Sequence, residues 1–263
     1  MTDDAHSLAV FIDFENLAIG FERKPAAKGR AKKAEPDAFD MGLVLERLVE
    51  KGKILVKTAY ADWGRFSQYV TPLHDAGIQL MEIPERGMTG KNYADIKLCV
   101  DAMDLCYAKE HIDTFVVVSG DSDFTPLVSK LKENGKRVIG LGMRDSTSDL
   151  LANNCDEFIY YEDLGQAPSE PATPLSSVPK AKRPAMRLLI ESIQALQREN
   201  VDVMHSSMVK DTMKRKQPSF TESQYGFKNF STLLEGAREL GLVTLRKDPR
   251  SGTYVVEGFA GER

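Results

Sequence analysis

Short apolar runs alternate with amphipathic segments over roughly the first 163 residues. Residues 8–13 and 113–119 are almost continuously apolar, which is typical of strands buried on both faces of a parallel sheet. Further strands are predicted at residues 54–60, 78–83, 136–142 and 157–161, and helices at 39–50, 66–76, 92–107 and 124–131. Regular alternation of strand and helix predicts an α/β fold with a parallel sheet flanked by helices.

The pattern changes after residue 163. Five prolines lie among Ser, Ala and Thr between residues 164 and 184, which indicates a semi-stiff linker. Beyond it, three helical segments (185–196, 206–214 and 230–240) precede two alternating stretches at 242–246 and 253–256. Three helices followed by a hairpin are typical of a winged helix, a relative of the helix-turn-helix. The sequence therefore predicts an α/β domain at 7–163, a linker at 164–184 and a small winged-helix domain at 185–260.

Composition adds limits on location. The net charge is -4, and residues from 185 onward hold 12 Lys and Arg against 10 Asp and Glu, so the acidity belongs to the first domain. The three cysteines lack metal-binding spacing, which favours a reducing compartment. No signal peptide is visible, and no apolar run approaches the roughly 18 residues of a membrane span. We expect a cytoplasmic protein without a membrane partner.

Carboxylates follow two of the buried strands. Asp13 ends the first strand, and Asp121 and Asp123 follow the strand at 113–119. The carboxyl ends of parallel strands share one edge of a sheet, where ligands bind. Asp95, expected in the first turn of the helix at 92–107, would reach the same edge. A purely structural alternative is open for each residue, because acids cap helices, form turns and favour helix amino termini.

Clustered carboxylates favour a divalent cation. Like charges in a low-dielectric site are costly unless a cation or protons neutralise them. Carboxylates without Cys, and with few His nearby, favour Mg²⁺ or Mn²⁺. Such an ion activates water and stabilises charge on phosphate oxygens, which is the chemistry of phosphodiester hydrolysis. No Gly-rich phosphate loop follows any predicted strand, so dinucleotide and Walker motifs are absent.

A basic segment at residues 22–36 interrupts the α/β pattern after the first strand. It is either a solvated insertion or a contact to a nucleic-acid backbone. Its cations are Arg23, Lys24, Lys28, Arg30, Lys32 and Lys33.

Three ordered motifs resemble the NYN family, PIN-like nucleases that include the LabA-like proteins. They are VFIDFENL at 10–17, the series Lys91, Asp95, Asp101, and VVSGDSDF at 117–124, with KRVIGLG at 136–142 adding to the likeness. The resemblance spans roughly residues 7–163. It implies a PIN-like fold and metal-dependent cleavage of RNA, most simply by an endonuclease.

The same resemblance implies roles for single residues. The metal-binding and catalytic carboxylates would be Asp13, Asp95 and Asp121, with Asp123 as a fourth. Asn16 would orient a ligand or substrate phosphate, Ser119 would support the turn, and Lys91 would contact nucleic acid. Asp101 lies about 120° around the helix from Asp95, so it would support the ligands rather than join them.

Residues 225–234 and 240–243 are similar to the LOTUS (OST-HTH) domain, a winged helix linked to RNA biology and known beside NYN domains. Its basic residues would contact nucleic acid: Lys210, Lys214, Arg215, Lys216 and Lys228. Tyr225 or Phe227 either stacks on a base or belongs to the core. RNA, a quadruplex nucleic acid and a protein partner such as a helicase all stay open as its ligand.

The predicted function is hydrolysis of single-stranded or structured RNA by a divalent-metal ribonuclease with a C-terminal RNA- or partner-binding winged helix. One alternative is a non-catalytic RNA-binding or scaffold protein that retains the acidic pocket. A second is a phosphoryl-acceptor domain like a response-regulator receiver, although no loop clearly supplies the lysine that such a domain needs. No pattern predicts an oligomeric state.

Overall fold

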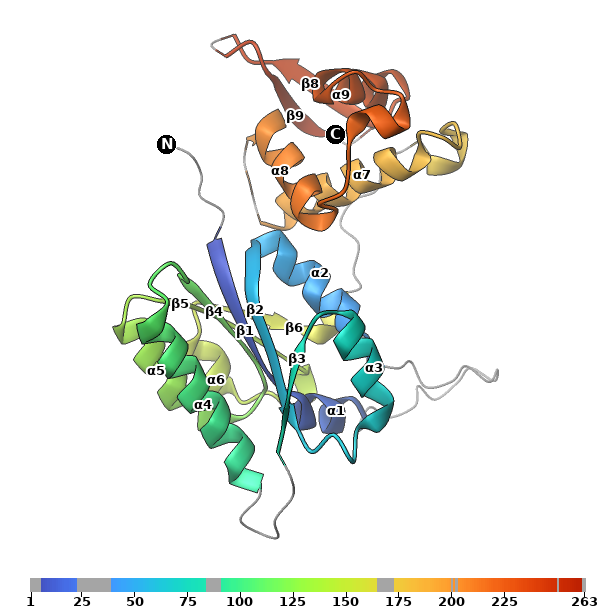
Figure 1. Cartoon of the computed structure of the whole chain (residues 1–263). Helices are drawn as coiled ribbons and strands as arrows, with labels where there is room; N and C mark the ends of the chain where they lie inside the picture. Colours follow the sequence, from blue (N-terminus) through green and yellow to red (C-terminus); the bar gives the residue numbers. More distant parts are fainter. Residues whose placement is uncertain are drawn as a thin grey trace. The chain divides into compact units, whose positions relative to one another are not determined.

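The chain divides into two compact units, residues 1–165 and 166–263 (Figure 1). The computed structural model describes residues 6–22, 39–83, 91–164, 173–199, 201, 203–249 and 251–261. The basic segment at 23–36 lies outside the described residues, as do the side chain of Lys91 and the linker residues 165–172. No helix in the described ranges has the length and apolarity needed to cross a membrane.

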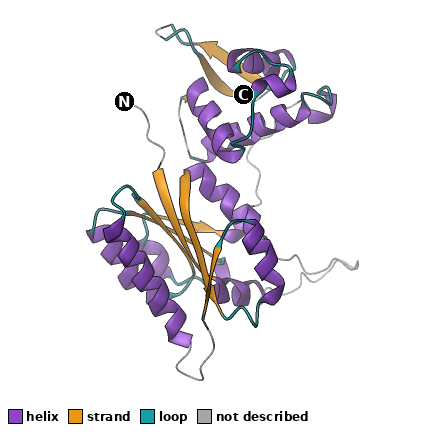
Figure 2. Cartoon of the chain, in the orientation of Figure 1, coloured by secondary structure: helices purple, strands orange, loops and turns teal. Residues whose placement is uncertain are grey.

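The first unit is built on a six-stranded parallel sheet, as the alternation of strands and helices predicts (Figure 2). Its strands are β1 (His6–Asp13), β2 (Gly52–Ala61), β3 (Gln79–Glu82), β4 (Thr114–Val118), β5 (Arg137–Gly142) and β6 (Glu157–Tyr160). Its helices are α1 (Phe14–Glu22), α2 (Met41–Lys51), α3 (Ser67–Asp75), α4 (Lys91–Ala108), α5 (Thr125–Glu133) and α6 (Asp149–Asn154). The sequence pattern did not anticipate the short helices α1 and α6.

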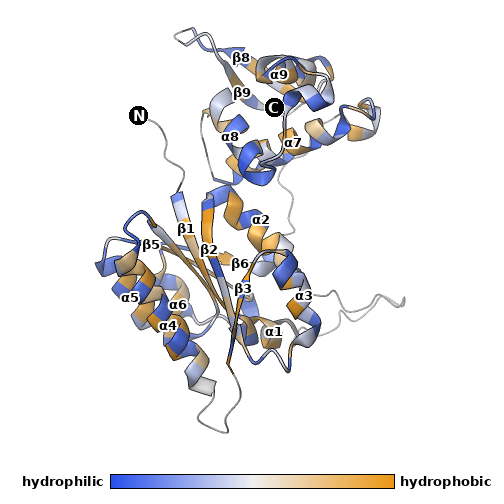
Figure 3. Cartoon of the chain, in the orientation of Figure 1, coloured by the Kyte–Doolittle hydropathy of each residue, from blue (hydrophilic) through white to orange (hydrophobic). Residues whose placement is uncertain are grey.

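Side chains of each central strand alternate between two apolar layers. On β1, Leu8, Val10 and Ile12 belong to the core cluster that includes residues of α1, α2 and α3. Ala9 and Phe11 belong to the cluster that includes residues of α4, α5 and α6. The central strands are coloured largely hydrophobic in Figure 3, in keeping with burial on both faces.

The strand order reverses between β1 and β4. The sheet runs β3-β2-β1-β4-β5-β6, so the chain moves outward from β1 in one direction and from β4 in the other. In open parallel sheets, a crevice for ligands forms outside the carboxyl ends of strands at such a point. The topology therefore puts the ends of β1 and β4 where a site is expected.

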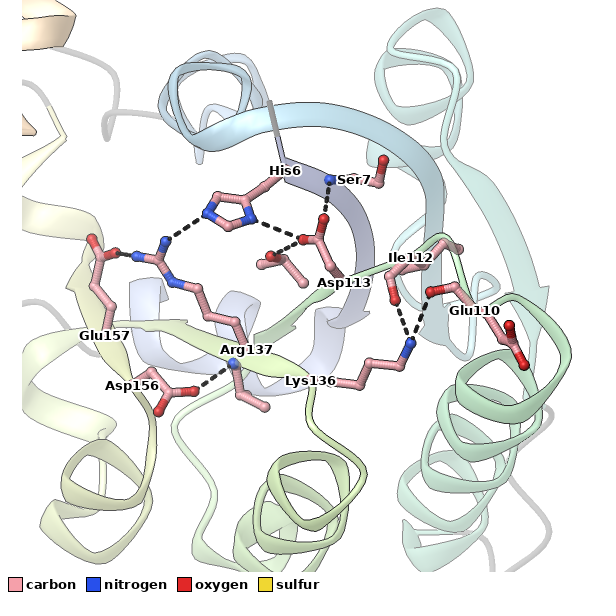
Figure 4. Close-up of polar contacts among 11 residues, drawn as sticks. His6, Ser7, Glu110, Ile112, Asp113, Lys136, Arg137, Asp156 and Glu157 are labelled. Atoms are coloured by element: carbon pink, nitrogen blue, oxygen red, sulfur yellow. Dashed lines mark hydrogen bonds and ion pairs between the residues drawn. The ribbon is translucent and has the colours of Figure 1, made fainter. Parts of the chain in front are cut away.

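The opposite, amino-terminal edge of the sheet carries a network of polar contacts (Figure 4). Nδ1 of His6 lies 3.0 Å from Oδ1 of Asp113, and the backbone N–H of Ser7 donates to Oδ2 of Asp113 at 3.2 Å. Arg137 donates to Glu157 at 2.9 Å and also contacts Nε2 of His6. These contacts join the starts of β1, β4, β5 and β6.

The second unit has the element order of a winged helix. Its elements are α7 (Arg183–Arg198), β7 (Met204–His205), α8 (Ser206–Lys216), α9 (Phe230–Glu239), β8 (Val243–Lys247) and β9 (Tyr254–Phe259). The three helices and the hairpin match the expectation, and β7 adds a third antiparallel strand in the order β7-β9-β8. Val178 is buried in this core, so residues of the expected linker already belong to the unit.

The orientation of α4 differs from what its periodicity suggests. The helix was predicted from the apolar row Ile96, Val100, Met103 and Tyr107. Three of these side chains are mostly exposed, Ile96 (60%), Val100 (57%) and Tyr107 (64%), and so is Tyr93 (57%). The side that faces the sheet is formed by Leu98, Ala102 and Cys106, which follow one another at intervals of four positions. The helix therefore has an apolar row on its outer side as well.

Candidate active site

Asp13 is the buried carboxylate at the point where the strand order reverses. It is the last residue of β1, and its side chain is 7% exposed. Its Oδ1 accepts the backbone N–H of Asn16 at 3.2 Å, and its Oδ2 accepts the hydroxyl of Ser119 at 2.9 Å. Ser119 directly follows β4, so the hydrogen bond ties together the carboxyl ends of the two central strands.

The turn after β4 is held by a chain of hydrogen bonds that starts at Asp13. The hydroxyl of Ser119 also accepts the backbone N–H of Asp121 at 3.2 Å, and Oδ1 of Asn16 accepts the N–H of Gly120 at 3.0 Å. Oδ1 of Asp121 accepts the N–H of Asp123 at 3.0 Å. Asn16, Ser119 and Asp121 are thus brought together with Asp13 because they follow β1 and β4, two strands that pair side by side.

Close backbone packing explains the glycine in this turn. A Cβ at Gly120 would lie 2.6 Å from the carbonyl oxygen of Ser146, which is closer than real Cβ contacts. The carbonyl of Gly120 accepts the N–H of Ser148 at 2.9 Å, so the segment after β5 closes over the turn. Within the described part of the chain, the buried hydroxyl oxygen of Ser146 has no hydrogen-bond partner. No sequence pattern pointed to Ser146, because its position over the turn depends on this contact between loops.

Asp95 contributes negative charge to the same site. The pKa of Asp13 is raised to about 7, mainly by burial and also by the charges of Asp95 and Glu15, while the hydrogen bonds from the Asn16 backbone and the Ser119 hydroxyl oppose the rise. Asp95 is the fifth residue of α4, so it lies just beyond the first turn where the sequence placed it. Glu15 was not among the predicted site residues; it accepts the N–H of Asp62 at 3.2 Å and lies 3.5 Å from Arg65.

Two of the expected carboxylates have other surroundings. Asp101 accepts the hydroxyl of Tyr60 at 2.9 Å and forms an ion pair with Lys97 one helical turn away. Asp123 is exposed, and it lies inside a short 3-10 turn, Ser122–Phe124. Asp121, rather than Asp123, caps this turn, and Phe124 occupies the cap position of α5. The structural alternative for Asp123, a cap of the following helix, is therefore wrong, because the 3-10 turn separates the strand from α5.

The donor chemistry of the centre suits a hard cation that keeps much of its water. Among the residues that the structure describes, no three His, Cys, Asp or Glu side chains are arranged to hold a metal ion by themselves. Burial is the main cause of the raised pKa of Asp13, and the nearby carboxylates of Asp95 and Glu15 add to it; a bound cation would neutralise this negative charge. Mg²⁺ is commonly held by one or two carboxylates plus water and substrate phosphate, which fits this sparse oxygen set.

The expected basic residues of the second unit have varied partners. Lys210 forms an ion pair with Glu222 at 3.0 Å, and Lys214 donates to the carbonyl of Phe220. Arg215 donates to Thr212 at 3.0 Å, whereas Lys228 is exposed.

The aromatic residues weighed for base stacking differ in exposure. Phe227 is 5% exposed and belongs to the core, and Tyr225 is partly buried and stacks on Phe220 at 5.5 Å between ring centroids. A separate concavity of about 350 Å³ was not foreseen, and its lining includes Lys180, Arg183, Arg187 and Gln217.

The α/β part of the chain is similar to known proteins. An uncharacterized protein of Methanocaldococcus jannaschii is 33% identical over 125 residues, which are 46% of this chain and 47% of that protein. The match therefore spans about half the length of that relative. A crystal structure of a protein of unknown function from Vibrio parahaemolyticus matches with a TM-score of 0.50 at 22% identity. It covers 62% of this chain and 98% of that chain, and this likeness concerns the fold alone.

The family model described as "NYN domain" matches residues 7–162, more than half of the chain. NYN domains are PIN-like nuclease domains, and the six-stranded parallel sheet flanked by helices agrees with that fold. This match gives the coarse assignment, a nuclease-like function related to RNA. The chain belongs to the NYN domain family.

Proposed function

We propose that the chain is a divalent-metal-dependent ribonuclease that cleaves RNA internally, with its active centre at Asp13, Asp95 and Asp121. The observation that carries the proposal is the buried carboxylate of Asp13 at the point where the strand order reverses. It accepts a hydrogen bond from Ser119, and the negative charge of Asp95 helps to raise its pKa. A buried carboxylate with a pKa raised to about 7 is costly for a fold, and such groups occur most often at functional sites. Mg²⁺ and Mn²⁺ are the proposed cofactors.

The chain's own residues would divide the work at this centre. Asp13 and Asp95 would hold the cation, which when bound supplies an activated water and charge stabilisation at a phosphate. Ser119 fixes the orientation of Asp13, and Asn16 fixes the backbone at Gly120. Asp121 is the partly exposed carboxylate at the rim, from which it can reach a cation or a substrate. Asp123 would assist there as an exposed neighbour.

Cleavage of a labelled single-stranded RNA tests this function. We expect wild type to cut with Mn²⁺ or Mg²⁺ and to stop with EDTA, and we expect Asp121→Asn to lose cleavage while it keeps its circular dichroism spectrum. Asp75→Asn, an exposed carboxylate at the end of α3, is the matched control and should cut normally. A circular RNA substrate, which has no ends, separates internal cleavage from exonuclease action. Cleavage by Asp121→Asn at the wild-type rate would contradict the site assignment.

Thermal unfolding tests metal binding without activity. An ion bound to the folded state at about 100 times its dissociation constant adds about 2.7 kcal/mol to the free energy of unfolding. We expect Mn²⁺ to raise the Tm of wild type and of Asp75→Asn, but not of Asp13→Asn. An equal shift in all three proteins would place the ion elsewhere.

We further propose that the second unit is a LOTUS-like winged helix that recruits RNA. The cations at its concavity, Lys180, Arg183 and Arg187, outnumber the one acid in the lining, Glu191. The exposed residues of α9 include Glu239 beside Arg238, and Glu235 accepts the hydroxyl of Tyr254, so this helix offers little positive charge. RNA phosphates would therefore bind near the start of α7, with Lys214, Arg215, Lys216 and Lys228 as further candidates.

Binding by the full chain carrying Asp121→Asn tests this recruitment. We expect Arg187→Glu to weaken binding of a single-stranded RNA and Arg246→Glu on β8 to change it little. A quadruplex nucleic acid is the second probe, and a preference for it would redirect the proposal to that structure. Unchanged RNA affinity in Arg187→Glu would remove the RNA role from the concavity and favour a protein partner.

Three free thiols, Cys99, Cys106 and Cys155, fit a reducing cytoplasmic setting for this activity.

A further inference from the structure

The outer side of α4 carries a continuous row of apolar side chains. Tyr93, Ile96, Val100 and Tyr107 are each more than half exposed, and Met103, which completes the row, is partly buried. We call these five residues the α4 seam. Single exposed apolar residues are ordinary, but contiguous apolar patches usually mark an interaction surface. A helix that is apolar on opposite sides is expected to be covered on both.

The spacing of the α4 seam is that of a helix that packs on another helix. Its residues follow one another at alternating intervals of three and four positions, the repeat of a two-helix interface. The row covers 14 residue steps, or about 21 Å of helix at 1.5 Å per residue. A helical partner of similar length would therefore cover it.

Charges on one flank indicate what that partner is. Lys97 directly follows Ile96 in the seam, and Asp104 directly follows Met103, so both lie on the same flank of the row. When two copies of a helix pack antiparallel, the same flanks face each other across the seam. Lys97 of one copy, which also forms an ion pair with Asp101 of its own helix, would then lie near Asp104 of the other, and the reverse contact would form as well. Such flanking ion pairs set partner choice and orientation.

We propose that the α4 seam is the contact between two copies of this chain, packed antiparallel about a two-fold axis. A two-fold interface uses the same patch on both subunits, and the seam meets this requirement because its charge pairs match in the antiparallel direction. In this alignment Ile96 packs against Tyr107 of the second copy, and Val100 packs against Met103 of the second copy.

Two consequences follow from this geometry. Standard interfaces bury about 800 Å² per partner, and a single helix supplies less, so the dimer should dissociate on dilution. The two copies of Asp95 would lie about 20 Å apart along the helix axes. The proposal concerns assembly, and it stands whether or not the acidic centre cleaves RNA.

Sedimentation equilibrium of the full chain tests the interface. We expect a monomer–dimer equilibrium for wild type and a monomer for Val100→Glu at the same concentrations. Val100 is 57% exposed, so the variant should fold, and an unchanged circular dichroism spectrum checks this. Leu150→Glu is the matched control, because Leu150 is 58% exposed on α6, outside the seam, and this variant should still dimerise. A monomeric wild type, or a Val100→Glu protein that dimerises like wild type, would overturn the proposal.

Charge reversal tests both the occupant and the direction. Lys97→Glu alone and Asp104→Lys alone should each dimerise more weakly than wild type, because each self-pairing brings like charges together. Mixing the two variants should restore association, because the mixed pair regains two opposite-charge contacts. If mixing gives no more dimer than either variant alone, the antiparallel self-pairing is wrong.

Discussion

At the scale of the residue, the acidic centre depends on how a few groups share hydrogen bonds. The hydroxyl of Ser119 donates to the carboxylate of Asp13 and accepts the backbone N–H of Asp121, so one side chain links the buried carboxylate to the backbone of the rim residue. The amide of Asn16 makes the parallel link to Gly120. Because these contacts join two strands, a change at any of them should affect the positions of both carboxylates.

Gly120→Ala tests this dependence. The new Cβ would meet the carbonyl oxygen of Ser146 at 2.6 Å, so the loop must move, and we expect a loss of about 1–3 kcal/mol in the free energy of unfolding. We also expect RNA cleavage to fall strongly. Gly135→Ala is the control: its Cβ would have open space but a φ of +73°, so it should destabilise by about 1–2 kcal/mol and leave cleavage unchanged. Chemical denaturation and the cleavage assay, run in parallel, separate the two effects.

Asp113→Asn tests the polar network on the opposite edge. Burial raises the pKa of Asp113, but hydrogen bonds from Thr114, Ser7 and His6 outweigh it and leave the pKa below its ordinary value. A lowered pKa adds stability above the unfolded-state value of about 3.9, and this stability is lost as the pH falls through the folded pKa. The variant should therefore have a lower Tm at pH 7 and approach wild type in strong acid. Asp113 is half exposed, so the effect should be under about 1 kcal/mol.

At the scale of the element, different interactions determine where a helix begins and which of its faces is buried. The start of α9 is set locally: Asn229 accepts the N–H of Thr232 at 2.9 Å, and the Thr232 hydroxyl accepts the N–H of Asn229 at 3.1 Å. The buried face of α4 is set by the sheet, which takes the side with Leu98, Ala102 and Cys106. Local capping can be read in the sequence, whereas the choice between two apolar faces depends on tertiary contacts.

Asn229→Ala should destabilise the second unit alone. Loss of this reciprocal cap is expected to lower the free energy of unfolding by about 1 kcal/mol. Ser231→Ala changes an exposed hydroxyl in the same helix and should cost less. Thermal melts of the two variants give the comparison, and equal Tm values for both would show that the cap contributes little.

At the scale of the whole molecule, the two units have separate cores. Two core clusters belong to the α/β unit and a third to the winged-helix unit. Each unit should therefore fold without the other and unfold in its own transition. The proposed assembly through the α4 seam involves the α/β unit, so the isolated residues 1–165 should dimerise as the full chain does.

Leu234→Ala tests the independence of the units. Leu234 is fully buried in the second core, and its truncation should lower the free energy of unfolding of that unit by about 2–5 kcal/mol. The transition of the α/β unit and the cleavage of a short RNA should stay unchanged. Differential scanning calorimetry distinguishes the two transitions, and a shift of both by the same amount would indicate one cooperative body.

The sequence by itself determined the elements whose signals are local. Continuous apolar runs predicted β1 and β4, because strands buried on both faces need apolar residues at every position. Asp13 and Asp121 could be recognised as candidate site residues because they come at or just after the ends of these apolar runs. Short helices such as α1 and α6 were missed because nine or six residues show too little periodicity to stand out.

Only the tertiary structure decided which distant groups meet. The reversal of strand order puts β1 beside β4 and so brings Asp13 to Ser119, a contact between residues 106 positions apart. The closure of Ser146 over Gly120 and the burial that raises the pKa of Asp13 arise from packing in the same way. A pattern along one chain records the periodicity of α4 but not which of its faces the sheet covers. That choice left the α4 seam exposed, because packing on the sheet satisfies one side of the helix.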